Sequence, residues 1–268
     1  MKLCRLNDNR LGVFHGDRLM DVTSALRVLP ALKWPVPQGD HLVLNFALVA
    51  QSIRELLPTA RAVPLDDVKF LSPIANPSKI IAAPLNYTKH VAEVGKDPQI
   101  HEGTHSFTYD GYRTPIDKLG LFIKANSSLV GPSEGIELVY PERRTDHEIE
   151  LAVVIGRLAK NITEAEALSY VLGYSICLDM TVRGPEDRSF RKSPDTYSVL
   201  GPVLVTADEI TEPEQLDFAI TVNGVRRQSG NTRLAAAHRH RRILLYAIPR
   251  RHHHDRHARR RRTGHGGR

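Results

Sequence analysis

The sequence predicts a mixed, β-rich α/β fold, in which a small N-terminal α/β module precedes a larger domain built mainly of strands. After Lys79, short apolar runs rich in β-branched residues recur between turn residues, as is typical of strands. In the N-terminal part, apolar side chains recur at helical spacing over residues 46–57. A chain of 268 residues is long enough to bury one sizeable core.

The N-terminal module is predicted to cover residues 1–72. Two short apolar segments within residues 11–22 flank a Gly-Asp turn, a pattern that predicts a hairpin. Thr23 or Ser24 is expected to cap a short helix after the hairpin. Residues 46–57 supply the second helix, so the module combines both kinds of element.

The larger domain is predicted to cover residues 73–233. A helix is expected over residues 164–171, with Thr163 as its N-cap and Glu166 at the capping-box position. Residues 94–118 are mostly polar without clear periodicity, which predicts a functional lid or a disordered loop. Strands are predicted over residues 80–83, 121–124, 149–155, 174–178, 203–205 and 218–222.

Two carboxylates at the start of the apolar run over residues 149–155 indicate a candidate metal-binding site. On a strand, Glu148 and Glu150 would lie side by side on one face. Like charges so close together repel each other, and burial also removes their water. A divalent cation offsets both costs, and hard ions such as Mg²⁺ prefer carboxylate oxygens. The alternative is a pair of exposed glutamates on an edge strand.

A third carboxylate, Asp179, ends the apolar run over residues 170–178. An acid at the end of a buried strand is unusual without a partner. Together with Glu148 and Glu150 it would supply three carboxylates to one ion and leave positions open for water and a chelating substrate. Alternatively, Asp179 caps the turn or helix that follows.

Charge and cysteine content narrow the class of protein. The net charge of +7 is unevenly distributed along the chain. Residues 234–268 hold eleven Arg and one Asp, a net charge of +10, so residues 1–233 carry a net charge of −3. The body is therefore mildly acidic, and no nucleic-acid partner is expected for it. Cys4 and Cys177 suggest no disulfide framework, which favours a reducing cytoplasm. No membrane span or signal peptide is expected.

Several segments, taken in order, resemble the fumarylacetoacetate hydrolase family over roughly residues 73–233. An ordered set of motifs is far more specific than any one of them. The matching segments are Pro77-Ser78-Lys79-Ile80-Ile81-Ala82, Leu85-Asn86-Tyr87-Thr88-Lys89-His90, Leu129-Val130-Gly131-Pro132, His147-Glu148-Ile149-Glu150-Leu151, Leu178-Asp179-Met180-Thr181-Val182-Arg183, Lys192-Ser193-Pro194-Asp195-Thr196, Leu200-Gly201-Pro202, and Val222-Asn223-Gly224 with Gln228.

The resemblance implies a β-sandwich or roll, usually a homodimer, with Mg²⁺ (or Mn²⁺ or Ca²⁺) on a Glu-x-Glu pair and a later Asp. By position these ligands are the three carboxylates already selected. His90 and Glu93 match the family's His-x-x-Glu dyad, in which a carboxylate orients the imidazole that activates water. Arg183 and Lys192 match its cationic substrate contacts, and Tyr87 is a weaker candidate for the pocket wall. In isolation, each would be taken for an ordinary surface residue.

The implied activity is metal-dependent cleavage of a C–C bond in small β-diketo or 2-oxo acids, through an enolate that the metal stabilises. The lead prediction is thus a C–C bond hydrolase acting on fumarylacetoacetate- or acylpyruvate-like substrates in aromatic catabolism. The first alternative keeps the site but makes the enzyme a decarboxylase or isomerase of related diacids. The sequence separates these reactions poorly.

The resemblance stops after Arg233, where the chain becomes rich in Arg and His. Family members continue with Thr-Gly-Thr-Pro-x-Gly-Val-Gly, whose Thr lines the active site. Codons for residues 250–263 can be chosen that, read one base later, encode Gly-Asp-Ile-Ile-Met-Thr-Gly-Thr-Pro-Gly-Gly-Val-Gly-Pro. Fourteen compatible positions in a row are hard to reach by chance. We hypothesise a one-base slip near Arg233.

The tail leaves two further alternatives open. Residues 234–268 have few large apolar side chains and are predicted not to build a core. If the slip is real, the chain could be an inactive, truncated pseudoenzyme. The second alternative is that the arginines of the tail bind nucleic acid, in which case binding should depend steeply on salt concentration. The tail has no aromatic residue beyond Tyr246 for stacking on bases, which weakens this alternative.

Overall fold

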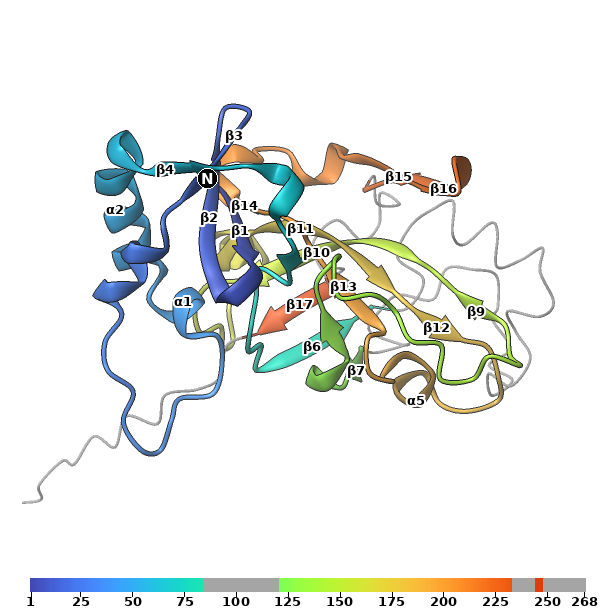
Figure 1. The fold of residues 1–268 in the computed structure, drawn as a ribbon. Coiled ribbons are helices and arrows are strands. Elements are labelled where there is room, and N and C mark those ends of the chain that lie inside the picture. The colour runs from blue at the N-terminus through green and yellow to red at the C-terminus, as the bar shows by residue number, and fades with distance from the viewer. Residues whose placement is uncertain (84–120, 233–243, 248–268) are drawn as a thin grey trace, which may run out of the picture.

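The computed structural model describes residues 1–83, 121–232 and 244–247, and in this part of the chain one large mixed sheet dominates (Figure 1). The sheet has 13 strands, ten of which follow the order β4-β3-β2-β1-β14-β11-β10-β17-β6-β7. Its strands are β1 (Lys2–Leu6), β2 (Arg10–His15), β3 (Arg18–Asp21), β4 (Arg61–Val63), β5 (Phe70–Leu71), β6 (Lys79–Ala82), β7 (Phe122–Lys124), β8 (Leu129–Val130), β10 (Ile149–Ile155), β11 (Val171–Asp179), β13 (Ser198–Leu200), β14 (Leu204–Thr206) and β17 (Leu244–Ala247).

Smaller elements surround this sheet. Two strand pairs are separate from it: β9 (Thr145–Asp146) with β12 (Thr181–Val182), and β15 (Asp217–Val222) with β16 (Val225–Asn231). The described α-helices are α1 (His41–Leu44), α2 (Phe46–Leu56) and α5 (Arg188–Lys192). The described 3-10 helices are η1 (Asn7–Asn9), η2 (Thr23–Val28), η3 (Leu57–Thr59), η4 (Leu65–Asp67), η6 (Asn126–Ser128), η7 (Glu164–Tyr170), η8 (Ala207–Glu209) and η9 (Pro213–Gln215). The predicted β-rich mixed class is therefore confirmed.

The N-terminal hairpin forms as predicted, since β2 and β3 pair antiparallel. The predicted cap is wrong, because η2 begins at Thr23 itself. The Thr23 hydroxyl instead donates a 2.6 Å hydrogen bond to Asp21. Helix α2 buries Val49 and Ile53 against Leu3 of β1 and so closes the small core of this module.

Pairing of β1 with β14 joins the N-terminal strands to the large sheet, with Lys2 opposite Val205 and Leu3 opposite Leu204. Strand β14 also pairs with β11. Backbone hydrogen bonds therefore cross the predicted boundary at residue 72, and the proposed division into domains stays a prediction.

The capping box at Thr163 is confirmed, because its hydroxyl and Glu166 make the reciprocal contacts. The helix that it starts, η7, is a 3-10 helix that ends at Tyr170. Strand β11 begins directly after it, at Val171, three residues before the predicted start. A long β11 can pair with β10 along almost its whole length.

Strand β10 lies inside the sheet, between β11 on one side and β17 on the other. Glu148, just before β10, is buried and Glu150 is half-buried, so the alternative of two exposed glutamates is wrong. The core packed against this region includes Ala152 and Val154 of β10 and Cys177 of β11. A central, well-packed strand supplies a rigid support for the side chains at its start.

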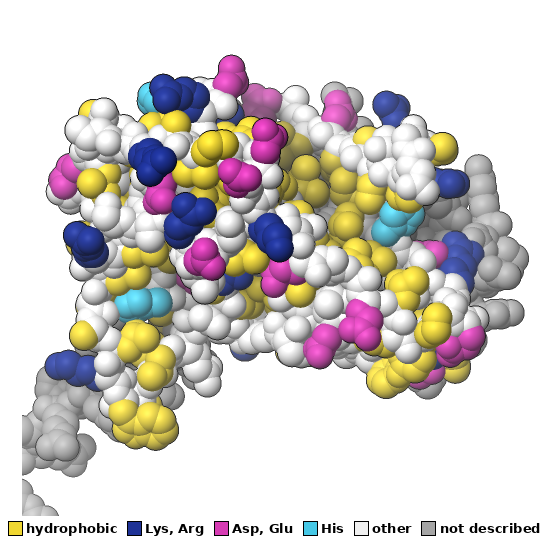
Figure 2. Space-filling model, viewed as in Figure 1, with side chains coloured by type: hydrophobic (Ala, Val, Ile, Leu, Met, Phe, Trp, Pro, Cys, Tyr) yellow, Lys and Arg dark blue, Asp and Glu magenta, His cyan; other side chains and the backbone are white. Residues whose placement is uncertain are grey.

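The segment over residues 30–39 projects at the lower left of Figures 1 and 2, where apolar side chains gather on the surface. Trp34 is 92% exposed there, and Leu32 and Val36 are also exposed. Across residues 1–83, 121–232 and 244–247, the helices are all too short or too polar to cross a membrane.

Candidate functional site

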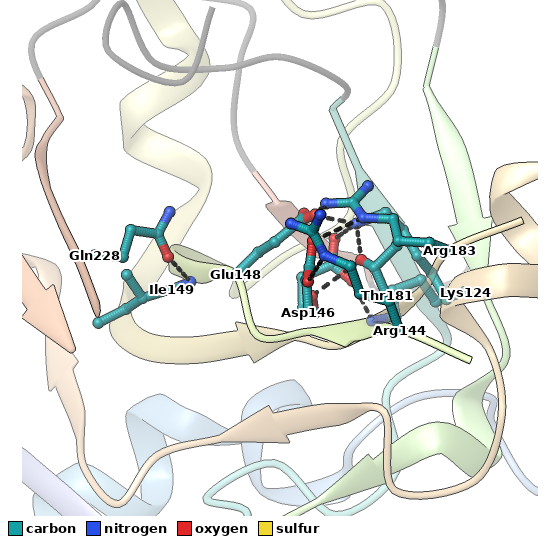
Figure 3. A network of polar contacts seen from close by, with 10 residues as sticks. Lys124, Arg144, Asp146, Glu148, Ile149, Thr181, Arg183 and Gln228 are labelled. Atoms are coloured by element: carbon teal, nitrogen blue, oxygen red, sulfur yellow. Dashed lines mark hydrogen bonds and ion pairs between the residues drawn. The ribbon is translucent and has the colours of Figure 1, made fainter. Parts of the chain in front are cut away.

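Two carboxylates meet where β10 and β11 pair. The Asp179 amide donates a 2.8 Å hydrogen bond to the Glu148 carbonyl, so the two residues lie opposite each other. Opposite residues of an antiparallel pair point to the same face of the sheet. Glu148 is 9% exposed and Asp179 is 6% exposed. Buried carboxylates require cationic partners, and Figure 3 shows these gathered around them.

The ammonium of Lys192 lies between these carboxylates. Its Nζ donates to Glu148 Oε2 and Asp179 Oδ2 at 2.7 Å each, and to Thr181 Oγ1 at 2.6 Å. Lys192 ends the short helix α5, which the Asp187 side chain caps at its start. Burial lowers the Lys192 pKa, but Asp179 and Glu148 outweigh burial and raise that pKa above its ordinary value.

A second lysine, Lys124 at the end of β7, was missed by sequence reasoning. Its Nζ donates to Asp179 Oδ1 and, at 2.8 Å, to the Tyr197 carbonyl. Lys124 is only 2% exposed, and burial followed by repulsion from Lys192 lowers its pKa despite Asp179. Lys124 also ends a short apolar run, but no neighbouring residue indicates its buried partner Asp179.

Arg183, directly after β12, is a third cationic residue beside the buried carboxylates. Its Nε donates to Asp146 Oδ2 at 2.8 Å, and its Nη2 to Glu148 Oε1 at 3.0 Å (Figure 3). Arg144 Nε donates to the other Asp146 oxygen at 2.8 Å. Burial raises the Asp146 pKa, but the two arginines outweigh burial and hold it below the ordinary value. Gln228 of β16 instead accepts a 2.9 Å hydrogen bond from the Ile149 amide.

The loop that carries Arg183 is held by Arg143. Two nitrogens of Arg143 donate to the two Glu186 oxygens at 3.0 and 2.8 Å. Its Nε donates to the Arg183 carbonyl at 2.9 Å, and Arg191 donates to the Glu186 carbonyl at 2.8 Å. A planar guanidinium is suited to such two-pronged binding of a carboxylate. Glu186 thus helps to hold the residues beside the site.

Glu150 lies in β10, two residues after Glu148, and is paired opposite Cys177 of β11. Burial raises the Cys177 pKa well above its ordinary value, and the charges of Glu150 and Asp179 raise it further. Glu150 therefore shares the electrostatic environment of Asp179. Three of the site residues from sequence reasoning, Tyr87, His90 and Glu93, lie outside the described residues.

The donor atoms fit a hard divalent ion, because two carboxylate oxygens and one hydroxyl already surround a single cationic nitrogen, Lys192 Nζ. Within the described part of the chain, no three His, Cys, Asp or Glu side chains lie close enough together to hold a metal as they stand. Glu148 and Asp179 are the described carboxylates that converge, with Glu150 as the neighbouring ligand candidate.

The C-terminal model of fumarylacetoacetate (FAA) hydrolase matches residues 79–243, which contain this whole cluster. The chain belongs to the fumarylacetoacetate hydrolase family. Maleylpyruvate hydrolase of Aquipseudomonas alcaligenes is 53% identical over 232 residues, 87% of this chain and 79% of that protein. A mitochondrial oxaloacetate tautomerase of Rattus norvegicus is 34% identical, over 67% of this chain and 53% of that protein.

Solved structures agree with membership of the fumarylacetoacetate hydrolase family. The crystal structure of maleylpyruvate hydrolase from Sphingobium sp. SYK-6 with manganese(II) and pyruvate has a TM-score of 0.68 and 33% identity. The match covers 89% of this chain and 79% of that one. The predicted family, its fold and the hydrolase class are confirmed. A divalent metal is supported through this relative, whereas the choice of Mg²⁺ stays a prediction.

Proposed function

We propose that this chain is a divalent-metal-dependent C–C bond hydrolase of small 2-oxo acids of the acylpyruvate type. The observation that carries the proposal is the meeting of Glu148 and Asp179 with Lys192 and Arg183 in one buried cluster. Two maleylpyruvate hydrolases among the relatives, at 53% and 33% identity, support the substrate class. Such substrates carry a carboxylate beside an oxo group, and negative charge develops on oxygen as the C–C bond breaks.

The described side chains suit two tasks in this reaction. Lys192 and Arg183 supply positive charge that binds the substrate carboxylate and stabilises the oxygen that becomes negative. Glu148, Glu150 and Asp179 would hold the metal ion, and the ion would supply Lewis-acid polarisation of the oxo group. His90 is proposed to take a proton from the attacking water, with Glu93 orienting its ring and Tyr87 lining the pocket.

Three finer assignments belong to the same proposal. Mg²⁺ is the proposed ion, with Mn²⁺ or Ca²⁺ as alternatives, because carboxylate oxygens are the ligands that these ions prefer. A homodimer is proposed from the family resemblance. A cytoplasmic location is proposed because Cys4 and Cys177 are both free, buried thiols.

A second candidate function is isomerisation or decarboxylation of a related oxo diacid at the same site. The observation that favours it is the 34% identity to an oxaloacetate tautomerase. Lys192 and Arg183 would stabilise an enolate in that reaction too, but no water would attack the substrate. The two candidates therefore differ in their products, because only hydrolysis gives pyruvate and a second acid.

The test measures cleavage of an acylpyruvate such as maleylpyruvate by loss of ultraviolet absorbance and by release of pyruvate. We expect activity with Mg²⁺ or Mn²⁺, loss with chelator, and a decrease of about 100-fold or more in Glu148→Gln. Asp217→Asn, an exposed carboxylate on β15, is the matched control and should keep full activity. Turnover without pyruvate release would favour the second candidate. A second chain, with the C-terminus encoded by the alternative reading frame, is assayed in parallel. Activity in that chain alone would mean that the proposed reaction is right and that the present C-terminus abolishes it. Inactivity in both chains would mean that the proposed reaction is wrong.

A further inference from the structure

Asp179 is held between two lysine ammonium groups, one on each carboxylate oxygen. Lys124 donates to Oδ1 and Lys192 donates to Oδ2. The lysines come from elements far apart in sequence, the strand β7 and the helix α5. Two buried cations next to each other repel, so each must have its own set of partners. The hydrogen-bond partners of Lys192 are side-chain oxygens, whereas those of Lys124 include a main-chain carbonyl.

Lys192 contacts only side-chain oxygens within the described cluster: Glu148 Oε2, Asp179 Oδ2 and Thr181 Oγ1. Its Nζ also lies 5.7 Å from the centre of the Phe122 ring, within the range of a cation–π contact. The helix that carries it is five residues long and packs beside β7 and β12. The partners of Lys192 are therefore all side chains, which can change conformation without moving the backbone.

Lys124 has a main-chain partner instead. Besides Asp179 Oδ1, it donates to the Tyr197 carbonyl, which is 2.8 Å away and is fixed by the backbone. Its own backbone is paired with β6 through Ile80. Its side chain is only 1% exposed. Lys124 is therefore fixed in place.

We propose that a divalent ion bound at Glu148 and Asp179 displaces the Lys192 ammonium, whereas Lys124 stays on Asp179. The inference rests on the metal site of the proposed function. Lys192 Nζ now occupies the space between Glu148 Oε2 and Asp179 Oδ2, and an ion held by both carboxylates would need that space. Electrostatic repulsion between the ion and the ammonium adds to this steric conflict.

Displacement gives Lys192 two roles in turn. While it bridges Glu148 and Asp179, it neutralises carboxylates that would otherwise be buried without compensation. Once displaced, its ammonium is beside the ion and free to bind the substrate's carboxylate or developing oxyanion. Lys124 acts only as a positioning residue, because it keeps one Asp179 oxygen engaged in both situations.

The first experiment uses the unaltered full chain and Mn²⁺ alone as the probe. Lysines are acetylated with a small reagent, with and without Mn²⁺, and the label at each lysine is quantified by mass spectrometry. We expect Mn²⁺ to increase labelling of Lys192 several-fold and to leave Lys124 unlabelled, with exposed Lys33 as the unchanged reference. Binding of Mn²⁺ with unchanged or reduced labelling of Lys192 would overturn the proposal.

The second experiment measures the Kd for Mn²⁺ by calorimetry in Lys192→Met and Lys192→Arg. Removing the competing charge should tighten binding by about tenfold, equivalent to about 1.4 kcal/mol, whereas Lys192→Arg should bind no more tightly than wild type. Equal or weaker binding by Lys192→Met contradicts displacement while leaving the metal site intact. If neither wild type nor Lys192→Met binds Mn²⁺, both the metal site and this inference fall. The acetylation result decides the matter if Lys192→Met does not fold.

Discussion

The main-chain hydrogen bond from the Asp179 amide to the Glu148 carbonyl, 2.8 Å long, fixes the distance between the two central carboxylates of this protein. Both side chains leave the same face of the sheet because the two residues are cross-strand neighbours. The geometry of the cluster is thus set by backbone pairing between two central strands. Substitutions that keep the backbone but change one side chain should therefore report on charge alone.

Asp179→Asn should destabilise the chain strongly while preserving its shape. The amide keeps one oxygen but turns an NH₂ group toward a lysine ammonium, which leaves a buried cation without its carboxylate. Breaking a buried ion pair in this way costs about 3–5 kcal/mol of unfolding free energy. Urea unfolding measures this loss of unfolding free energy. The control is Asp217→Asn at an exposed position, whose unfolding free energy should lie within about 0.5 kcal/mol of wild type. A change as small as that of the control would show that the lysines find other partners.

Neither cysteine should react with thiol reagents in the folded protein. Burial raises the pKa of Cys4 to about 12 and that of Cys177 well above its ordinary value. Since the thiolate is the reactive form, both groups are inert at neutral pH. Labelling kinetics at pH 8 should show no reaction until denaturant is added. A thiol that reacts at the rate of a free cysteine in the native chain would contradict this burial.

The N-terminal hairpin should lose stability in acid through Asp21. Burial raises its pKa, but the hydroxyl and amide of Thr23 and the charge of Arg10 outweigh burial and lower it. A lowered folded-state pKa means that this contribution is present above about pH 4, the unfolded value, and is lost as pH falls through the folded value.

Urea unfolding between neutral and acid pH tests the Asp21 contribution. The difference in unfolding free energy between wild type and Asp21→Asn should be largest at neutral pH and should shrink toward pH 2. Asp17→Asn in the exposed turn of the same hairpin is the control. A difference that stays constant with pH would mean that the carboxylate charge of Asp21 contributes nothing.

Deleting residues 234–268 should weaken the large sheet. Strand β17 pairs with β10 on one side and with β6 on the other, so its removal leaves each of them with one unpaired edge. Unpaired strand edges promote association between chains. We expect a lower Tm and larger species in sedimentation velocity. An unchanged Tm and a single unchanged species would show that β17 adds nothing to the sheet.

Sequencing the gene, together with an in-frame comparison chain, tests the proposed slip near Arg233. A chain carrying the alternative frame should exceed the present one in Tm if the family's native C-terminus completes the fold. Finding no alternative frame that encodes Thr-Gly-Thr-Pro would dispose of the hypothesis.

The sequence was informative where a charge interrupts an apolar run. The two-residue spacing of Glu148 and Glu150 at the start of one run, and Asp179 at the end of another, indicate the site. The structure places Glu148 opposite Asp179, with Lys192 and Arg183 beside them. Lys124 was missed because a lysine at the end of a strand normally extends toward water. Its burial depends on Asp179, 55 residues away, which no local pattern reveals.

Long-range pairing limited the prediction of the fold in the same way. The hairpin of β2 and β3 and the capping box at Thr163 follow from neighbouring residues and were predicted correctly. Pairing of β1 with β14 brings Lys2 opposite Val205, far along the chain, and has no local signature. The composition of residues 234–268 predicts no core, yet residues 244–247 form β17 in the middle of the sheet. Composition alone does not show which short segment completes a sheet.

The place of β17 has a consequence for how the protein is made. Synthesis proceeds from the N-terminus, so β6 and β10 leave the ribosome well before the strand that lies between them. We expect the nascent chain to expose the edge of β10, the strand beside the carboxylates, until β17 has been synthesised. Chaperones and proteases would therefore meet the protein in this open form. A change of reading frame in the last part of the gene would then alter survival of the nascent chain before it altered chemistry.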